Sequence, residues 1–222
     1  MKILAFSDVH GNVDAVEKLY AKTQNVDFEV IIFGGDFTNE YFDGFEKGQV
    51  QMNGFCEVIK RYDKPFYYVY GNRDLGVRCP IGNCIEEKDW DIGKYTLTNQ
   101  IEKIDKSKIL VNHYLHTQFK DKQVNALLYL YGHDHIGRIY KNYIDLGFLY
   151  RGTEAHGARE AGYGCYWIIE INNGKITVEN KSWDLRESTC DRHPNQGIFY
   201  LPYYYKKNCM LCYDEIENRL NF

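Results

Sequence analysis

Residues 127–135 read LLYLYGHDH, an apolar run that ends on the two histidines His133 and His135. Short apolar runs rich in β-branched and aromatic residues predict buried strands of an α/β sheet. Sheets of this type carry their chemistry at the carboxyl ends of the strands. This stretch therefore predicts a strand that delivers two imidazoles to a site at the edge of a sheet.

Four more apolar runs end in the same way, each on a side chain that can bind a metal. The runs 3–6, 30–33, 66–70 and 109–111 lead to Asp8 and His10, to Asp36, to Asn72 and to His113, respectively. This repetition is hard to explain unless the strand ends converge. We therefore expect one metal site with seven ligands, namely Asp8, His10, Asp36, Asn72, His113, His133 and His135.

The spacing and the donor types of these side chains indicate which ions they would bind. Asp8 and His10 stand two apart at a strand end, where alternate side chains point the same way. Asp36 follows two glycines that let the backbone turn sharply, and its two oxygens could bridge two cations. Oxygen and nitrogen donors of this kind suit Mn²⁺, Fe²⁺, Zn²⁺, Co²⁺ or Ni²⁺. Two such ions would make the site net positive, attract phosphate oxygens and lower the pKa of a bridging water.

The order of the predicted elements indicates the fold class. Glycines at 44, 48 and 54 make the segment 39–54 read mostly as loop. Alternating strands and helices up to about residue 135, followed by shorter antiparallel strands, predict a mixed-sheet α/β sandwich with helices outside. We predict helices at 12–23 and 55–62, strands at 2–7, 29–34, 66–70, 84–86, 94–97, 108–112, 127–131, 137–141, 146–150, 163–171 and 175–183, and a hairpin turn at Asn172-Asn173-Gly174.

Composition limits the class of protein. The 222 residues suffice for one sizeable domain. The 27 basic and 31 acidic residues are spread without long blocks and give a net charge of −4, so nucleic-acid binding is not favoured. The chain starts on strand-like residues, and no apolar stretch approaches the ~20 residues that span a bilayer. We therefore expect a cytoplasmic protein without a signal peptide or membrane contact.

The five strand-end motifs together resemble those of a known family. Asp8-Val9-His10, Gly35-Asp36, Gly71-Asn72-Arg73-Asp74, His113 and Gly132-His133-Asp134-His135 occur in the order typical of the calcineurin-like metallophosphoesterase superfamily, and the resemblance covers about residues 1–185. It implies a sandwich of two mixed β-sheets flanked by helices. It also implies one ion held by Asp8, His10, Asp36 and His135, a second held by Asp36, Asn72, His113 and His133, and a metal-bridging hydroxide that attacks phosphorus.

The third motif departs from the family pattern. Many relatives carry a histidine after the asparagine, where it assists the leaving group, but this chain carries Arg73. A guanidinium does not donate its proton at neutral pH, yet it binds phosphate bidentately, so we expect Arg73 to stabilise transition-state charge. The residues expected to act in catalysis are Asn72, Arg73, Asp74 and His113, with Asp74 orienting a neighbour, and those expected to contact substrate are Arg73, Thr153 and His156.

The last 36 residues suggest a separate metal site. Cys190 and His193, then Cys209 and Cys212, form two pairs at the spacing of ligands that wrap a tetrahedral Zn²⁺. We therefore divide the chain into a catalytic domain, 1–186, and a C-terminal extension, 187–222, that a structural zinc would stabilise. Unconnected thiols in a packed tail, or disulfides, are the alternatives. Cys79 and Cys84 form another close pair, but no second pair accompanies them.

These observations predict a binuclear, metal-dependent phosphoesterase that hydrolyses a phosphate ester of a small molecule or nucleotide. Phosphodiesters are favoured over monoesters because compact single-domain relatives often cleave them. Two alternatives from other classes stay open. A metal-dependent nuclease predicts a basic groove beside the metals, and a non-catalytic interaction scaffold predicts partner binding that survives loss of the metals.

Overall fold

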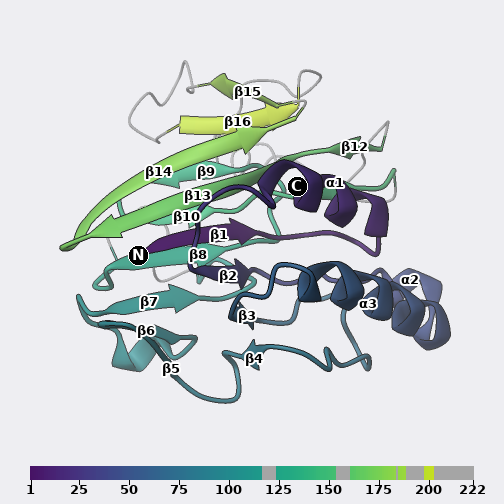
Figure 1. Cartoon of the computed structure of the whole chain (residues 1–222), viewed down its shortest axis with the longest axis horizontal. Coiled ribbons are helices and arrows are strands. Elements are labelled where there is room, and N and C mark those ends of the chain that lie inside the picture. Colours follow the sequence, from purple (N-terminus) through teal and green to yellow (C-terminus); the bar gives the residue numbers. More distant parts are fainter. Residues whose placement is uncertain (117–123, 154–160, 184, 189–197, 203–222) are drawn as a thin grey trace, which may run out of the picture.

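Two mixed β-sheets form the body of the structure, a computed structural model, and the main helices gather on the outside of one of them (Figure 1). The structure describes residues 1–116, 124–153, 161–183, 185–188 and 198–202. This arrangement confirms the α/β sandwich of two mixed sheets that the sequence predicts.

The first sheet combines four parallel strands with an antiparallel hairpin. Strands β1 to β4 run parallel, β13 pairs antiparallel with β1, and β14 pairs antiparallel with β13. The predicted hairpin turn is confirmed, because Asn173 and Gly174 both adopt positive φ, 49° and 81°, as a tight two-residue turn requires. The sheet order is β14 (Lys175–Ser182), β13 (Cys165–Asn172), β1 (Lys2–Phe6), β2 (Val30–Phe33), β3 (Phe66–Tyr68) and β4 (Asn83–Cys84).

The second sheet has a parallel centre and antiparallel edges. Strands β6, β7, β8 and β10 are parallel, whereas β5, β9, β15 and β16 pair antiparallel with their neighbours. Its order is β15 (Leu185–Ser188), β16 (Ile198–Pro202), β9 (Arg138–Tyr140), β10 (Tyr143–Asp145), β8 (Leu128–Tyr131), β7 (Lys108–Val111), β6 (Tyr95–Thr98) and β5 (Trp90–Ile92). A separate pair is formed by β11 (Tyr150–Arg151) and β12 (Gly162–Tyr163).

Alternating side chains of β1 show how the layers are held together. Ile3 and Ala5 are buried in the core between the sheets, whereas Leu4 and Phe6 are buried under the helices. The helices are α1 (Val13–Thr23), α2 (Glu40–Asp43) and α3 (Phe45–Lys60), with a short 3₁₀ turn at Ile101–Lys103. Helix α1 starts where Asn12 accepts a hydrogen bond from the Ala15 amide at 2.8 Å. The sheet that bears β1 is therefore buried on both faces.

The loop predicted at 39–54 is wrong, because α2 and most of α3 occupy it. Two of its glycines serve close packing rather than loop formation. A Cβ on Gly48 would lie 2.9 Å from Glu40 Cβ, and one on Gly54 would lie 2.6 Å from Val13 Cγ2. The third, Gly44, has a φ of 83° and separates the two helices.

The strand predicted at 146–150 is also displaced. Strand β10 ends just before this segment, and strand β11 begins only at its last residue. Gly147, between the two strands, adopts a φ of 71°. Its missing side chain matters, since a Cβ there would lie 3.0 Å from the backbone of Gly137. The buried apolar residues Leu146, Phe148 and Leu149 produced the strand signal although they line an irregular connection.

The C-terminal predictions fall largely beyond the described part of the chain. Cys190, His193, Cys209 and Cys212 all lie outside the described residues, as does His156. The described strands β15 and β16 join the second sheet along β9. Among the other cysteines, Cys79 faces Cys56, with 3.6 Å between the sulfurs, rather than Cys84.

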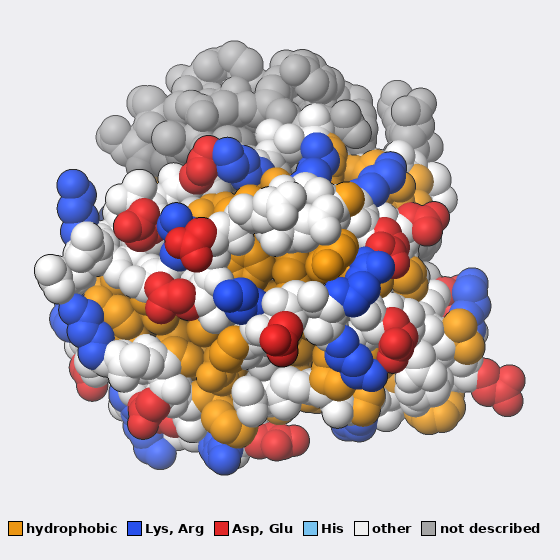
Figure 2. Space-filling view, viewed as in Figure 1, with side chains coloured by type: hydrophobic (Ala, Val, Ile, Leu, Met, Phe, Trp, Pro, Cys, Tyr) orange, Lys and Arg blue, Asp and Glu red, His pale blue; other side chains and the backbone are white. Residues whose placement is uncertain are grey.

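The surface and the helices add two observations. On the face drawn in Figure 2, basic and acidic side chains are interspersed with apolar ones. No helix within the described ranges has both the length and the apolar composition needed to cross a bilayer.

Candidate metal centre

The turns that follow β1, β2, β3, β7 and β8 bring all seven predicted ligands together. Asp8 and His10 follow β1, Asp36 follows β2, and Asn72 follows β3, while His113 follows β7. His133 and His135 come after β8. Both sheets thus contribute, so the cluster bridges the two layers at one end of the sandwich.

Asp8, His10 and His135 form one buried group. The Nε2 atoms of His10 and His135 lie 3.0 Å apart, and His135 Nε2 lies 3.0 Å from Asp8 Oδ1. His10 Nε2 is 3.6 Å from the same carboxylate oxygen. Three donor atoms therefore surround one small volume, which is the arrangement that a cation requires.

Asp36 connects this group to a second one. Its Oδ2 lies 3.9 Å from His10 Nε2 and 3.5 Å from His113 Nε2. The Asn72 side-chain oxygen lies 3.1 Å from His113 Nε2 and 3.0 Å from His133 Nδ1. One carboxylate oxygen of Asp36 thus faces imidazole nitrogens of both groups.

The backbone at the ligands is unusual. Asp8, His10, Asp36, His133 and His135 all adopt positive φ, between 49° and 73°. This left-handed conformation costs a non-glycine residue on the order of 1 kcal/mol or more, and it concentrates at functional sites. Hydrogen bonds between the turns hold it in place, since the Asp8 amide donates to the Gly35 carbonyl oxygen at 2.9 Å and the His10 amide to that of Asp36 at 3.1 Å.

A glycine directly precedes the ligand in three of these turns, and each lacks room for a side chain. A Cβ on Gly71 would lie 2.1 Å from Asp36 Oδ1, and one on Gly132 would lie 2.5 Å from Asp8 Oδ2. A Cβ on Gly35 would lie 2.6 Å from His113 Nδ1. Each glycine therefore leaves space for a ligand from a different strand.

The carboxylates and imidazoles of the cluster shift each other's pKa, and a bound cation would displace the proton that His113 carries. Burial alone would raise the pKa of Asp8, but the adjacent His135 and His10 hold that pKa well below its ordinary value. Burial lowers the pKa of His113, yet the hydrogen bond and charge of Asp36 outweigh it and raise the pKa to about 9. His113 Nδ1 contacts the Gly34 carbonyl oxygen at 2.8 Å, which leaves Nε2 to face Asp36 and Asn72.

These donors fit divalent cations by chemistry and by placement. Two buried carboxylates, one amide oxygen and four imidazole nitrogens form a continuous series of contacts of 3.9 Å or less. Oxygen and nitrogen donors without a thiolate suit borderline divalent ions. The ring nitrogens of His10 and His135 face each other, and a cation between them would bind to both.

Asp74, which the sequence places among the catalytic residues, lies behind the ligands. It accepts hydrogen bonds from the amides of Phe37, Thr38 and Gly71 and from the Thr38 hydroxyl, at 2.9 to 3.1 Å. Burial and the charge of Asp36 raise its pKa to about 6, and the hydrogen bonds act against this. Asp74 thus ties the Asp36 turn to the Asn72 turn and is a positioning residue.

Arg73 lies at the rim of the cluster. Its amide donates to Asp36 Oδ1 at 2.8 Å, while its guanidinium stacks over Phe42, 4.3 Å from the ring centre. Thr153, the other described substrate candidate, is exposed after β11. β11 lies near the site because the Tyr150 amide donates to the Asp8 carbonyl oxygen at 3.1 Å.

Sequence reasoning missed four residues around the cluster. Tyr41 and Phe42 stand beside Arg73, and Tyr114 stands beside His133. Buried Glu40 accepts hydrogen bonds from the amides of Gly76 and Val77 and so fixes the loop that follows Asn72. The position of Tyr114, next to His113, was the one available signal, because the other three fell in the segment read as loop.

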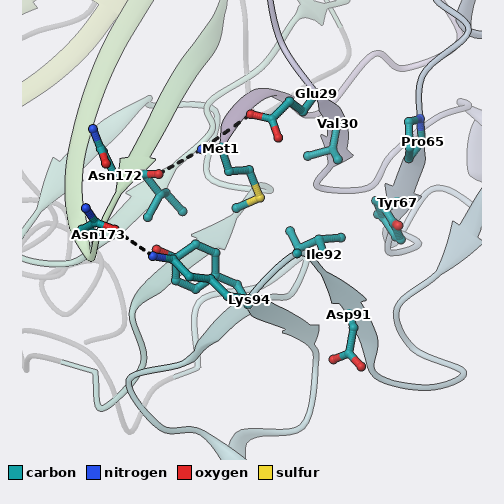
Figure 3. A pocket seen from close by; sticks show the side chains of 13 residues that line it. Met1, Glu29, Val30, Pro65, Tyr67, Asp91, Ile92, Lys94, Asn172 and Asn173 are labelled. Atoms are coloured by element: carbon teal, nitrogen blue, oxygen red, sulfur yellow. Dashed lines mark hydrogen bonds and ion pairs between the residues drawn. The ribbon is translucent and has the colours of Figure 1, made fainter.

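A separate cavity lies at the other end of the sheets. It measures about 580 Å³ and is lined by the amino ends of β1 and β2, the β5–β6 turn and the β13–β14 turn, among them Met1, Glu29, Lys94 and Asn173 (Figure 3). None of the seven candidate ligands lines it. This cavity is therefore distinct from the candidate metal centre.

Comparisons with known proteins agree with the fold and show the family of the chain. A novel archaeal phosphodiesterase has a similar fold, with a TM-score of 0.52, 17% identity, and coverage of 82% of this chain and 100% of that chain. The protein TT1561 of Thermus thermophilus has a TM-score of 0.50, 14% identity, and coverage of 81% of this chain and 98% of that chain. No curated protein matches. The sequence matches the calcineurin-like phosphoesterase superfamily domain over residues 1–174, and the chain therefore belongs to that superfamily.

Proposed function

We propose that this chain hydrolyses phosphodiesters with two divalent cations held by the seven clustered side chains. As a member of the calcineurin-like phosphoesterase superfamily, the chain is a phosphoester hydrolase. The similar archaeal protein is a phosphodiesterase, and we extend that substrate class to this chain. Mn²⁺, Fe²⁺, Zn²⁺, Co²⁺ and Ni²⁺ all suit the donor set.

The position of Asp36 is the observation that carries the proposal. Its Oδ2 lies within 3.9 Å of His10 Nε2 and 3.5 Å of His113 Nε2. Asp8, His10, Asp36 and His135 would hold one cation, and Asp36, Asn72, His113 and His133 would hold the other. When bound, such a pair supplies a water of lowered pKa and neutralises charge on the phosphate.

The remaining residues fix and complete this arrangement. Asp74 holds the Asp36 and Asn72 turns at a constant separation through four hydrogen bonds. Arg73 binds a non-bridging phosphate oxygen and stabilises charge that develops on the leaving side. Because a guanidinium keeps its proton, esters with good leaving groups react fastest.

Turnover of aryl phosphates tests the proposal. We expect wild-type protein with Mn²⁺ to hydrolyse bis(4-nitrophenyl) phosphate with a higher kcat/KM than 4-nitrophenyl phosphate. Asp36→Asn preserves the size of the side chain and an acceptor for the Arg73 amide but removes the negative charge that both cations share. It should lower kcat by about 100-fold or more.

Asp105→Asn is the matched control, because Asp105 is exposed, its side chain accepts hydrogen bonds from Ser107, and it precedes β7, whereas the ligand His113 follows the other end of that strand. It should leave turnover unchanged. Absence of turnover with every one of the five divalent ions would refute the hydrolase and favour an interaction scaffold. Equal loss in both variants would refute the role of Asp36.

A further inference from the structure

Three aromatic side chains beside the metal centre are unusually exposed. Tyr41 and Phe42 on α2 retain 58% and 53% of their surface, and Tyr114 after β7 retains 48%. Together with Arg73, we call these residues the aromatic rim. Exposed aromatic surface that gathers beside a functional site is typical of ligand binding rather than of folding.

Arg73 joins one side of the rim to the metal ligands. Its guanidinium carbon lies 4.3 Å from the Phe42 ring centre and 5.3 Å from that of Tyr41, and the two rings meet edge to face at 4.9 Å. The Tyr41 amide donates to the Arg73 carbonyl oxygen at 3.2 Å, and the Arg73 amide donates to Asp36 Oδ1 at 2.8 Å. One residue therefore separates the rings from the carboxylate that both cations would share.

Tyr114 forms the other side of the rim. Its ring centre lies 4.3 Å from that of His133 and 5.0 Å from that of His113. Tyr114 therefore packs against two of the candidate ligands while about half of its surface, 48%, stays exposed.

We propose that the aromatic rim binds a planar aromatic ring on the leaving side of the substrate. Arg73 links Tyr41 and Phe42 to Asp36, so a ring that stacks on one of these two aromatic side chains and meets the other edge to face would lie beside a phosphate bound at the cations. The rings and the guanidinium offer stacking and cation–π contacts that an aliphatic group does not match. This inference rests on the proposed function and narrows its substrate class to esters of aryl alcohols or nucleosides.

A substrate comparison in wild type and variant tests the inference. Two diesters share one non-leaving group and have leaving groups of matched pKa, one aryl and one fluoroalkyl. In the double variant Tyr41→Ala/Phe42→Ala, the aryl-to-alkyl ratio of kcat/KM should fall about tenfold, the size of one or two aromatic contacts. The intrinsic reactivity of each ester cancels in this comparison, and most of the fall should appear in KM.

Two further variants separate stacking from other effects. The double leucine variant Tyr41→Leu/Phe42→Leu keeps apolar area but removes both rings, so it should also lower the ratio. Val50→Ala removes an exposed apolar side chain of α3, which is 70% exposed, and should leave the ratio unchanged. A diester with a nucleoside leaving group is assayed beside the aryl ester to identify which of the two classes the rim binds. The ester of the class that the rim binds should lose more kcat/KM in the double variant Tyr41→Ala/Phe42→Ala.

The outcomes distinguish this inference from the proposed function. If wild type hydrolyses both esters and the double variant keeps the same ratio, the rim does not select a ring, although the hydrolase stands. If Tyr41→Leu/Phe42→Leu keeps the full ratio while Tyr41→Ala/Phe42→Ala loses it, apolar area rather than stacking is responsible, and the inference is overturned. If wild type hydrolyses no ester with any divalent ion, both proposals fail together.

Discussion

At the scale of single residues, two buried carboxylates have different roles in the centre. Asp36 faces histidines of both groups, whereas Asp74 accepts hydrogen bonds from four donors in the turns behind it. One carboxylate is therefore placed for cations and the other for backbone geometry. Because Asp74 fixes the backbone of these turns, Asp36 keeps a constant position although its turn follows two glycines.

Removal of the Asp74 side chain should destabilise the fold. Asp74→Ala leaves two buried amides, one partly buried amide and a buried hydroxyl without their acceptor, so we expect the free energy of unfolding to fall by about 2–3 kcal/mol. Urea denaturation monitored by tryptophan fluorescence measures the change. Asp105→Asn should stay within about 0.5 kcal/mol of wild type. A similarly small effect of Asp74→Ala would show that the four hydrogen bonds do not hold the turns.

Single residues also show how far the sequence predicts the site. All seven candidate ligands can be predicted because each lies within a few residues of the end of an apolar run, and the structure brings all seven together. Tyr41 and Phe42 were missed because their exposure and their stacking on Arg73 depend on α2, which the sequence did not predict. Local pattern identifies donors at strand ends, but it does not identify surfaces built by packing.

At the scale of elements, the strand-end turns depend on glycines that leave room for ligands of other strands. Gly71→Ala would place a methyl group 2.1 Å from Asp36 Oδ1, and neither the carboxylate nor the backbone can move without loss of ligand geometry. We expect this variant to lose about 100-fold or more in kcat/KM while it remains folded. The phosphodiesterase assay and circular dichroism measure the two properties.

Gly162→Ala is the matched control for this prediction, because within the described part of the chain nothing lies within 4 Å of the added methyl group, and φ is not positive there. It should retain wild-type kcat/KM. Full activity in Gly71→Ala would contradict the claim that the turns are packed against the ligands.

Glycine also explains where the element predictions failed. Gly48 and Gly54 read as loop residues, but they allow α3 to pack closely on Glu40 and on Val13 of α1. Whether a glycine ends a helix or lets two helices approach depends on the neighbour, which can lie far away in the sequence. The five strands that carry the ligands were predicted within about two residues, because burial on both faces makes them continuously apolar.

At the scale of the whole molecule, the centre joins the two sheets, so cation binding should stabilise the entire fold. Asp8 and Asp36 follow strands of the first sheet, whereas His113 and His135 follow strands of the second. A ligand that binds only the folded state stabilises it by mass action. Mn²⁺ at about 100 times its Kd should therefore raise Tm by about 5–10 °C over chelator-treated protein.

Differential scanning calorimetry with and without Mn²⁺ measures this shift, and Asp36→Asn should reduce it by at least half. An equal shift in Asp36→Asn would place the stabilising ion elsewhere.

The overall architecture itself was predictable, since alternating strands and helices followed by antiparallel strands produce the mixed sandwich seen here.

The most direct test of the account is anomalous diffraction from crystals grown with Mn²⁺. The account predicts two manganese peaks, about 3.5–4 Å apart, with Asp36 as the shared ligand. Asp8, His10 and His135 should complete the coordination of one ion, and Asn72, His113 and His133 that of the other. A single peak, or peaks without Asp36 between them, would contradict the binuclear centre.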